Sequence, residues 1–217
     1  MHCIVTAGPT YETLDNVRRL TNLSTGRLGT ELANFLVERG HQVTLLIGEQ
    51  ATYCGERQAQ RVETFTTTES LREQLRALAK QDVGAVFHAA AVSDFKFGKI
   101  WLRLPSGELS EIKSGKISTR RGPLLAELVP TPKIIAELRN WYPRARLIGW
   151  KFEVEGDRAD VLRAAGDQLA EFRTDACVAN GPAYGSGFGL AKRGSEQVVH
   201  APDKAALFAA LESLLHK

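Results

Sequence analysis

The sequence has little cysteine, no long hydrophobic run and no strong excess of one charge, and each shortage excludes a class of protein. Its three cysteines, Cys3, Cys54 and Cys177, are scattered and form no CxxC pair, so they predict neither a zinc site nor a redox dithiol. No stretch approaches the roughly 20 apolar residues that span a bilayer. The apolar run at residues 2–7 is too short for a signal peptide. The cytoplasm is therefore the expected compartment.

The charge balance excludes a second group of partners. The net charge is +3, from 28 basic and 25 acidic residues among 217. Binding to nucleic acid or to an anionic membrane requires clustered positive charge. The most basic stretch, residues 116–121, holds three basic side chains close to Lys113, which is too few. We expect neither nucleic acid nor a membrane as a partner.

Short apolar runs alternate with helical patterns along most of the chain. The runs predict buried strands at residues 2–7, 42–47, 85–91, 146–150 and 176–179, with weaker candidates at 61–65 and 197–200. Apolar residues at helical spacing predict helices at 26–39, 70–80, 133–138, 158–172 and 204–215. This alternation indicates a Rossmann-like α/β fold, with an open, mostly parallel sheet and helices on both faces.

The alternation is interrupted at about residues 97–132. Two runs, at 100–104 and 108–112, flank a Pro-Ser-Gly turn and predict a β-hairpin. We interpret the hairpin and the basic loop after it as an insertion at the edge of the sheet. Residues 1–217 are thus expected to form one nucleotide-binding α/β domain with this excursion.

Ligands of such folds bind beyond the carboxyl ends of the strands, where strand order reverses. Four loops qualify, at residues 8–25, 93–97, 150–156 and 180–188. In the first, Gly8 follows a strand, and the motif STGRLG at 24–29 opens a helix. Glycines let a phosphate approach the main chain, and a helix N-terminus is positive. The alternative is that these glycines serve helix–sheet packing alone.

Two blocks of sequence resemble the signatures of a known family. The segments TAGPT at 6–10 and TNLSTGRLG at 21–29 resemble the nucleotide loop of phosphopantothenate–cysteine ligases. The segment AAAVSDF at 89–95 is similar to the phosphopantothenate-binding segment of that family. Weaker matches, among them Lys116-Ile117, Pro132-Lys133-Ile134 and Trp150-Lys-Phe-Glu153, extend the resemblance in order to about residue 200.

The resemblance implies a ligase that joins 4′-phosphopantothenate to cysteine in coenzyme A biosynthesis. The substrate carboxylate would attack the α-phosphorus of CTP or ATP and release pyrophosphate, and the cysteine amine would then displace the nucleotide. Such chemistry requires alignment of two anions and donors aimed at the developing charge. It also requires Mg²⁺, which is usually held by few protein ligands and several waters. No metal ligand is identified from the sequence.

The resemblance also implies roles for individual residues. Asn22 would hold the acyl carbonyl, and Arg18 would clamp the substrate phosphate from the neighbouring subunit of a homodimer. The remaining candidates are, for the pantothenate chain, Ala90, Ala91 and Asp94; for the triphosphate, Gly8, Ser24, Gly26 and Gly29; for the base and ribose, Trp150 and Asn180; and for neutralising phosphate charge, Lys151. Structural alternatives are a solvated or ion-paired group for Arg18, a turn or cap for Asn22 and Asn180, core packing for Trp150, and a surface position for Lys151. His88, inside an apolar strand, is expected to be a core histidine.

Two departures from the family pattern leave questions open. Many bacterial relatives carry a K-x-K-x-x-D run before the strand that ends in Ala-Asn, but here residues 170–175 read AEFRTD. Arg173 or Lys151 would be the basic groups to compensate, and the choice between CTP and ATP stays open. Many bacterial versions are also fused to a flavin-dependent decarboxylase. That partner is either a separate protein or absent because this chain is an excised domain.

Two other functions compete with the ligase. A short-chain NAD(P) oxidoreductase would carry a Tyr-x-x-x-Lys pair, but none of the four tyrosines has a lysine four residues on. The predicted second strand also ends in Gly48, where a dinucleotide fold usually carries an acid. The second rival is a nucleotide-binding module without catalysis. The missing lysines at 170–175 are the feature that favours it.

Overall fold

A single eight-stranded sheet forms the centre of the molecule in the computed structural model, which describes residues 1–112, 117–118 and 122–216. The strand order is β13-β12-β11-β10-β6-β1-β4-β5. The strands are β1 (His2–Ala7), β4 (Gln42–Gly48), β5 (Arg61–Phe65), β6 (Ala85–His88), β10 (Arg146–Phe152), β11 (Ala176–Asn180), β12 (Phe188–Lys192) and β13 (Val199–Ala201). Neighbours from β5 to β11 are parallel, and β12 and β13 add antiparallel pairs at one edge. The Rossmann-like, mostly parallel prediction is confirmed.

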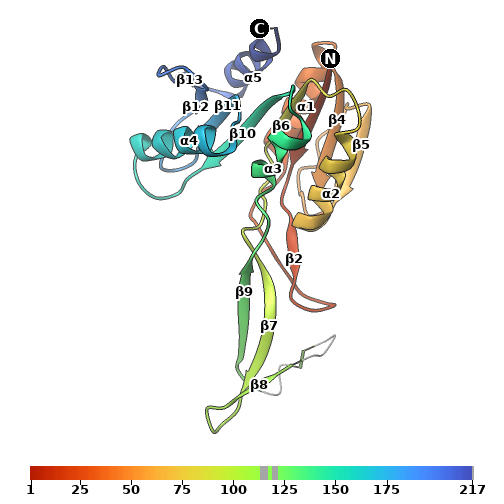
Figure 1. The fold of residues 1–217 in the computed structure, drawn as a ribbon, viewed down its shortest axis with the longest axis vertical. Coiled ribbons are helices and arrows are strands. Elements are labelled where there is room, and N and C mark those ends of the chain that lie inside the picture. Colours follow the sequence, from red (N-terminus) through yellow and green to blue (C-terminus); the bar gives the residue numbers. More distant parts are fainter. Residues whose placement is uncertain (113–116, 119–121, 217) are drawn as a thin grey trace.

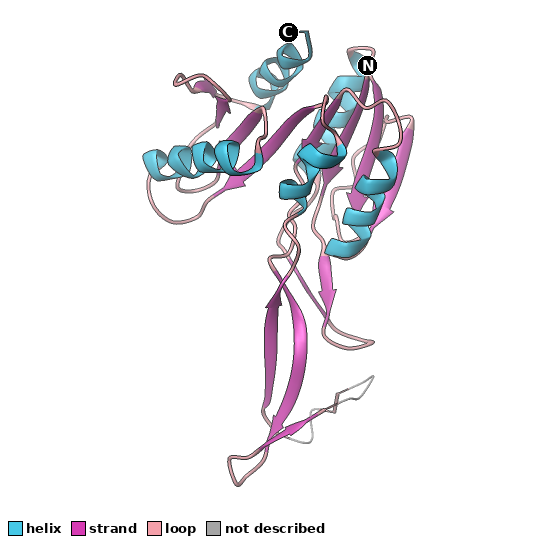
Figure 2. Ribbon diagram, in the orientation of Figure 1, coloured by secondary structure: helices cyan, strands magenta, loops and turns pink. Residues whose placement is uncertain are grey.

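Helices cover both faces of this sheet (Figures 1 and 2). One face packs against α1 (Arg27–Glu38) and α5 (Lys204–Glu212), which continues into the 3₁₀ helix η2 (Ser213–His216). The other face packs against α2 (Thr68–Leu78), α3 (Ile134–Trp141) and α4 (Arg158–Phe172). Alternate residues of β1 divide between the two cores, with Val5 facing α1 and Ile4 facing α2. None of the described helices is long and apolar enough to span a bilayer.

The strand order reverses between β1 and β6, in the middle of the sheet. From β1 the chain crosses through α1 to β4 and continues to β5, whereas from β6 it crosses to β10 and β11 on the other side. The two connections leave β1 and β6 in opposite directions, so the loops after these strands separate at the carboxyl edge. The position of a ligand cleft follows from this arrangement.

A three-stranded antiparallel sheet, β8-β7-β9, extends far from the main sheet (Figure 1). It consists of β7 (Phe95–Arg103), β8 (Leu109–Glu111) and β9 (Leu124–Pro130), and we call residues 95–130 the arm. The pairing of β7 with β8 agrees with the predicted hairpin, but its interpretation as an insertion at the sheet edge is wrong. The arm leaves from the carboxyl end of the central strand β6, and β5 and β13 are the edges. Of the basic stretch 116–121, only residues 117 and 118 are described, and Lys113 and Lys116 lie outside the described residues.

Four strands were not predicted. The hairpin of β2 (Tyr11–Thr13) and β3 (Arg19–Thr21) lies within the expected loop 8–25, while β9 and β12 lie in segments expected to be irregular. Strands β2 and β3 have three residues each, and β3 is fully exposed, so neither shows apolar alternation. Prolines at both ends of β9 and glycine within β12 are typical of turns. These strands exist because a partner strand supplies their hydrogen bonds.

Leu75 on α2 tests the core between this helix and the sheet. Its side chain is fully buried beside Ile4 and Phe65, so Leu75→Ala should lower the free energy of unfolding by about 2–5 kcal/mol. The matched control is Glu73→Ala, an exposed position on the same helix, which should change it by less than about 0.5 kcal/mol. Urea unfolding measures both; equal losses in the two variants would refute this packing.

Candidate functional site: a basic cleft at the strand-order reversal

A cleft of about 670 Å³ opens at the carboxyl ends of the central strands. Its walls are the loop and helix start after β1, the loop after β6, the start of α3, and the ends of β10 and β11. Segments from five separate parts of the chain therefore meet at the strand-order reversal. All the site residues expected from the sequence line it except Arg18.

Hydrogen bonds between main chains join the loops after β1 and β6. The N–H of Ala91 donates to the carbonyl of Gly8 at 2.9 Å, and the N–H of Thr10 donates to the carbonyl of Ala91 at 3.1 Å. The Asn22 amide nitrogen donates to the same Ala91 carbonyl at 3.0 Å. The side chain of Asn22 is thus fixed at the junction of the two loops, inside the cleft. The main chain at Ala90 and Ala91 lines the cleft beside it.

The start of α1 supplies the features of the cleft that favour phosphate binding. Gly26 is the N-cap with φ of +78° and makes no side-chain cap. The Thr25 hydroxyl accepts from the Arg27 N–H at 3.3 Å, and the next N–H groups of the first turn are left for water or an anion. Gly8 also has φ of +78°, and a Cβ there would lie 2.9 Å from the Cβ of Ala51. At Gly29 a Cβ would lie 2.6 Å from the Cβ of Ala7. Packing therefore requires these glycines whether or not phosphate binds.

The charges of the cleft favour an anion. Among its described lining residues, three side chains are cationic, Arg27, Lys133 and Lys151, and one is a carboxylate, Asp94. Lys133 Nζ lies 2.6 Å from Asp94 Oδ1, and Lys151 Nζ lies 2.9 Å from Glu153 Oε1. Both lysines can be drawn from these partly exposed pairs by a more highly charged ligand. A lone carboxylate cannot hold Mg²⁺ by itself, so ligand phosphates and water would have to complete its coordination, with Asp94 as the protein's contribution.

Two buried polar side-chain atoms of the cleft have no hydrogen-bond partner among the described residues. The indole nitrogen of Trp150 and the side-chain oxygen of Asn180 are buried and have no hydrogen-bond partner among the described residues. Both residues line the cleft, at the ends of adjacent strands β10 and β11. Buried polar groups are nearly always hydrogen-bonded. A ligand with an acceptor for the Trp150 N–H and a donor for the Asn180 oxygen would satisfy both.

Arg18 lies outside the cleft of its own chain. It is on the β2–β3 hairpin, where its guanidinium donates to Asp15 Oδ2 at 2.6 Å and to the carbonyl of Ile117 at 2.8 Å. The hydrogen bond from Arg18 lowers the pKa of Asp15. The Ile117 N–H also donates to Asp15. These bonds attach the hairpin to the arm and fix the position of the arginine.

Of the two basic groups considered as substitutes for the missing lysines, one lies in the cleft. Arg173 follows α4 with φ of +54° and donates to Asn140 Oδ1 at 3.0 Å. It precedes β11, whereas the cleft residue Asn180 ends β11, so Arg173 lies at the opposite end of the strand. Lys151 lines the cleft and is the available candidate.

The cleft residues missed from the sequence include three with long polar side chains: Arg27, Lys133 and Gln168. Lys133 belongs to a weakly matching segment that gave it no role, although its position immediately before a helix was a usable signal. Gln168 is in the middle of α4 and donates to the Cys177 sulfur at 3.0 Å. Nothing in the sequence connects it with the cleft, because it reaches this wall only through packing against β10 and β11.

Comparisons with known proteins agree with this geometry. The family described as the DNA/pantothenate metabolism flavoprotein C-terminal domain matches residues 1–207. The chain belongs to this family. A similar curated protein is the coenzyme A biosynthesis bifunctional protein CoaBC of Thermococcus kodakarensis, 34% identical over 82% of this chain and 40% of that protein. The Bacillus subtilis CoaBC protein is 30% identical over 87% of this chain and 42% of its own length.

The fold of this family is also known from solved structures. The DNA/pantothenate metabolism flavoprotein of Streptococcus pneumoniae superimposes with a TM-score of 0.83, at 25% identity, over 100% of both chains. The present chain spans about two fifths of the length of the two curated relatives. The comparison therefore concerns the C-terminal family domain.

His88 is the buried titratable group beneath the cleft. It ends β6, as expected of a core histidine, and its Nδ1 lies 3.0 Å from Thr6 Oγ1. That hydroxyl also accepts from the N–H of Ala90 at 3.1 Å. Burial lowers the pKa of His88 from 6.5 to about 4. The imidazole is thus neutral at pH 7 and supports the wall formed by Ala90.

The low pKa of His88 predicts a specific dependence of stability on pH. Because the unfolded chain takes up this proton near pH 6.5 and the folded chain only near pH 4, protonation favours unfolding as the pH falls between these values. Protonation of this histidine should lower the free energy of unfolding by on the order of 3 kcal/mol at pH 4, and it should have no effect above pH 7.5. Urea unfolding at several pH values measures it, and His88→Gln should remove that part of the slope. Parallel pH profiles for the two proteins would show that His88 is not buried neutral.

Proposed function

We propose that this chain is a phosphopantothenate–cysteine ligase that acts in coenzyme A biosynthesis. The observation that carries the proposal is the basic cleft at the strand-order reversal, which is lined by the start of α1 at Gly26 and by the unsatisfied Trp150 and Asn180. A nucleoside triphosphate has the matching parts, namely anionic phosphates and a polar base and ribose. The names of the curated relatives support the pathway.

In the proposed first step, the carboxylate of 4′-phosphopantothenate attacks the α-phosphorus of the nucleotide. A new oxygen–phosphorus bond forms, the bond to the β-phosphate breaks, and pyrophosphate leaves. The triphosphate would lie at Gly8, Ser24, Gly26 and the first turn of α1. Arg27, Lys133 and Lys151 line the same cleft and would offset the charge of two anionic substrates, which otherwise repel each other. Mg²⁺ would supply further neutralisation of the phosphates when bound.

In the second step, the cysteine amine attacks the acyl carbon and the nucleoside monophosphate leaves. Negative charge develops on the acyl oxygen, where a fixed neutral donor is effective. We assign that role to Asn22, whose amide is already oriented by the Ala91 carbonyl. Asp94 and the main chain at Ala90 and Ala91 would hold the pantothenate chain. A flavin-dependent decarboxylase, on this or a separate polypeptide, would then act on the product.

The oxidoreductase alternative has less support in the geometry. Glu49, the acid nearest the end of β4, is paired with Arg19 at 3.1 Å. A Cβ at Gly48 would lie 2.2 Å from the carbonyl oxygen of Pro9, so no acidic side chain fits at the end of this strand. A non-catalytic binding module would have the same cleft as the ligase. The two functions differ only in whether the bound nucleotide is consumed.

Pyrophosphate release separates the ligase from its rivals. The purified protein with Mg²⁺, 4′-phosphopantothenate and cysteine should release pyrophosphate from CTP or ATP, and release should require phosphopantothenate. The control omits that substrate. The nucleotide with the higher kcat/KM identifies the co-substrate. If neither nucleotide yields pyrophosphate, and the protein unfolds cooperatively, the ligase proposal fails and the chain is a binding module.

We further propose a homodimer in which each Arg18 serves the cleft of the neighbouring subunit. Arg18 lies outside the cleft of its own chain, on a hairpin held to the arm by Asp15. Apolar side chains on the hairpin and the arm are exposed, among them Val17, Leu20, Phe95 and Leu128. Covering them with a second copy would explain both features.

Mixing two inactive variants tests this exchange of Arg18. Arg18→Ala and Asn22→Ala should each abolish most ligation, because each removes one group from every cleft. After subunit exchange of an equal mixture, half of the dimers are mixed, and one of their two clefts is intact, so about a quarter of the wild-type activity should return. The control mixes Asn22→Ala with Asp94→Ala, whose residues belong to the same cleft. Recovery in neither mixture, with exchange verified by mass, would show that Arg18 does not serve the cleft of the neighbouring subunit.

A further inference from the structure

A cluster of potential metal ligands lies at the end of the sheet opposite the cleft. His41 directly precedes β4, and Glu212 and His216 lie at the end of α5 and in η2. In Figure 1 both chain termini are at this end, away from the arm. One ligand atom from each of the three side chains lies within 4.8 Å of the others. The proposed ligase chemistry uses none of them.

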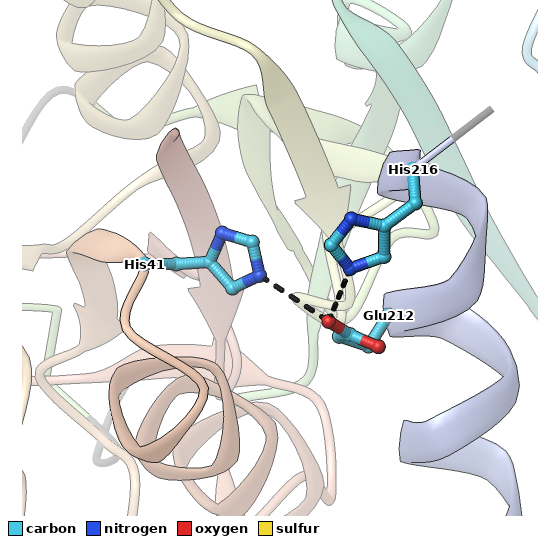
Figure 3. A group of neighbouring side chains, drawn as sticks. All are labelled: His41, Glu212 and His216. Carbon is cyan, nitrogen blue, oxygen red and sulfur yellow. Dashed lines mark hydrogen bonds and ion pairs between the residues drawn. The ribbon is translucent and has the colours of Figure 1, made fainter.

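The three side chains converge on one point (Figure 3). The Nε2 atom of His216 lies 2.5 Å from Glu212 Oε1, and the Nε2 atom of His41 lies 3.7 Å from the same oxygen. Glu212 and His216 are four residues apart on adjacent turns, which places both on one face of the helix. Two imidazoles and a carboxylate from two separate segments therefore share a small volume.

His41 lacks the hydrogen bonds that a buried imidazole normally makes. Its side chain is 7% exposed, and neither ring nitrogen has a hydrogen-bond partner among the described residues. The 3.7 Å contact with Glu212 is too long for a hydrogen bond. A buried imidazole without a hydrogen-bond partner, aimed at a carboxylate, is placed as a metal ligand would be.

We propose that His41, Glu212 and His216 bind one divalent cation of the zinc class. Imidazole nitrogen with a single carboxylate is a donor set for Zn²⁺ and similar transition metals, whereas Mg²⁺ and Ca²⁺ require oxygen ligands. Small side-chain movements would bring the three atoms to the roughly 2.0–2.2 Å from the metal that zinc requires, with water in a fourth position. A metal bound at His216 Nε2 replaces the hydrogen bond to Glu212 Oε1, and the imidazole carries its ring proton on Nδ1.

The consequence of binding is a link between the C-terminal helix and the turn before β4. Helix α5 packs on α1 through a limited apolar contact, including the Phe35–Phe208 ring pair at 5.7 Å. A metal held by both segments stabilises the folded chain, because the unfolded chain does not bring His41 near the other ligands. The role is structural and separate from the cleft.

The test uses nucleotide-free protein stripped with a chelator, in a Cys54→Ser background that removes the exposed thiol. Calorimetric titration with Zn²⁺ should give one site per chain, and Zn²⁺ should raise Tm. Co²⁺ should give the visible absorption of a four-coordinate site. Mg²⁺ should leave Tm unchanged.

Two variants and a control make the assignment specific. His216→Gln, at a largely exposed position, and Glu212→Gln should each weaken Zn²⁺ binding at least about tenfold. The control His200→Gln removes a histidine that contacts Tyr184 and Arg158, and it should bind Zn²⁺ like the parent protein. Equal affinity in His216→Gln and the parent, or less than one zinc per parent chain at saturation, would overturn the proposal.

Discussion

The hydrogen bonds that join the loops after β1 and β6 are the constraint on which the cleft depends. The carbonyl of Gly8 accepts from Ala91, and the carbonyl of Ala91 accepts from both Thr10 and Asn22. Strand order reverses at this point, so the two loops would otherwise diverge. Because one peptide carbonyl orients the Asn22 amide and pairs with the loop after β1, the position of the proposed acyl-binding group is set by the main chain.

The two ends of the sheet offer different chemistry. The carboxyl end gathers Arg27, Lys133 and Lys151 around a cleft that has a single carboxylate among its described residues, which favours anions and alignment over covalent catalysis. The amino end holds the His41 cluster, whose donors favour a transition metal. A parallel sheet separates them by the length of its strands, so a cation bound at one end is far from phosphates bound at the other. The arm, which leaves from the cleft end, presents a third surface suited to a second subunit.

Much of the fold was predictable because its strands are buried on both faces. The apolar runs of β1, β4 and β6 have no polar alternation and are bounded by glycine or polar loops, which is typical of a central parallel strand. The alternation with amphipathic helices then leaves few topologies. The arm was only half predicted. Strand β9 is bounded by prolines and exposes most of its residues, so the local pattern did not distinguish it from a loop. It forms a strand because it pairs with β7, which lies far from it in the sequence.

The sequence by itself determined the fold class, the cleft loops and most candidate residues, because these depend on local apolar patterns and on short motifs such as STGRLG at residues 24–29. Only the tertiary structure decided which residues meet. It brought Gln168 and Lys133 into the cleft, left Arg173 at the opposite end of β11, and kept Arg18 outside its own cleft. It also placed His41 beside His216, from opposite ends of the chain. Such proximity depends on how helices pack across a sheet, and residue spacing along the chain carries no record of that packing.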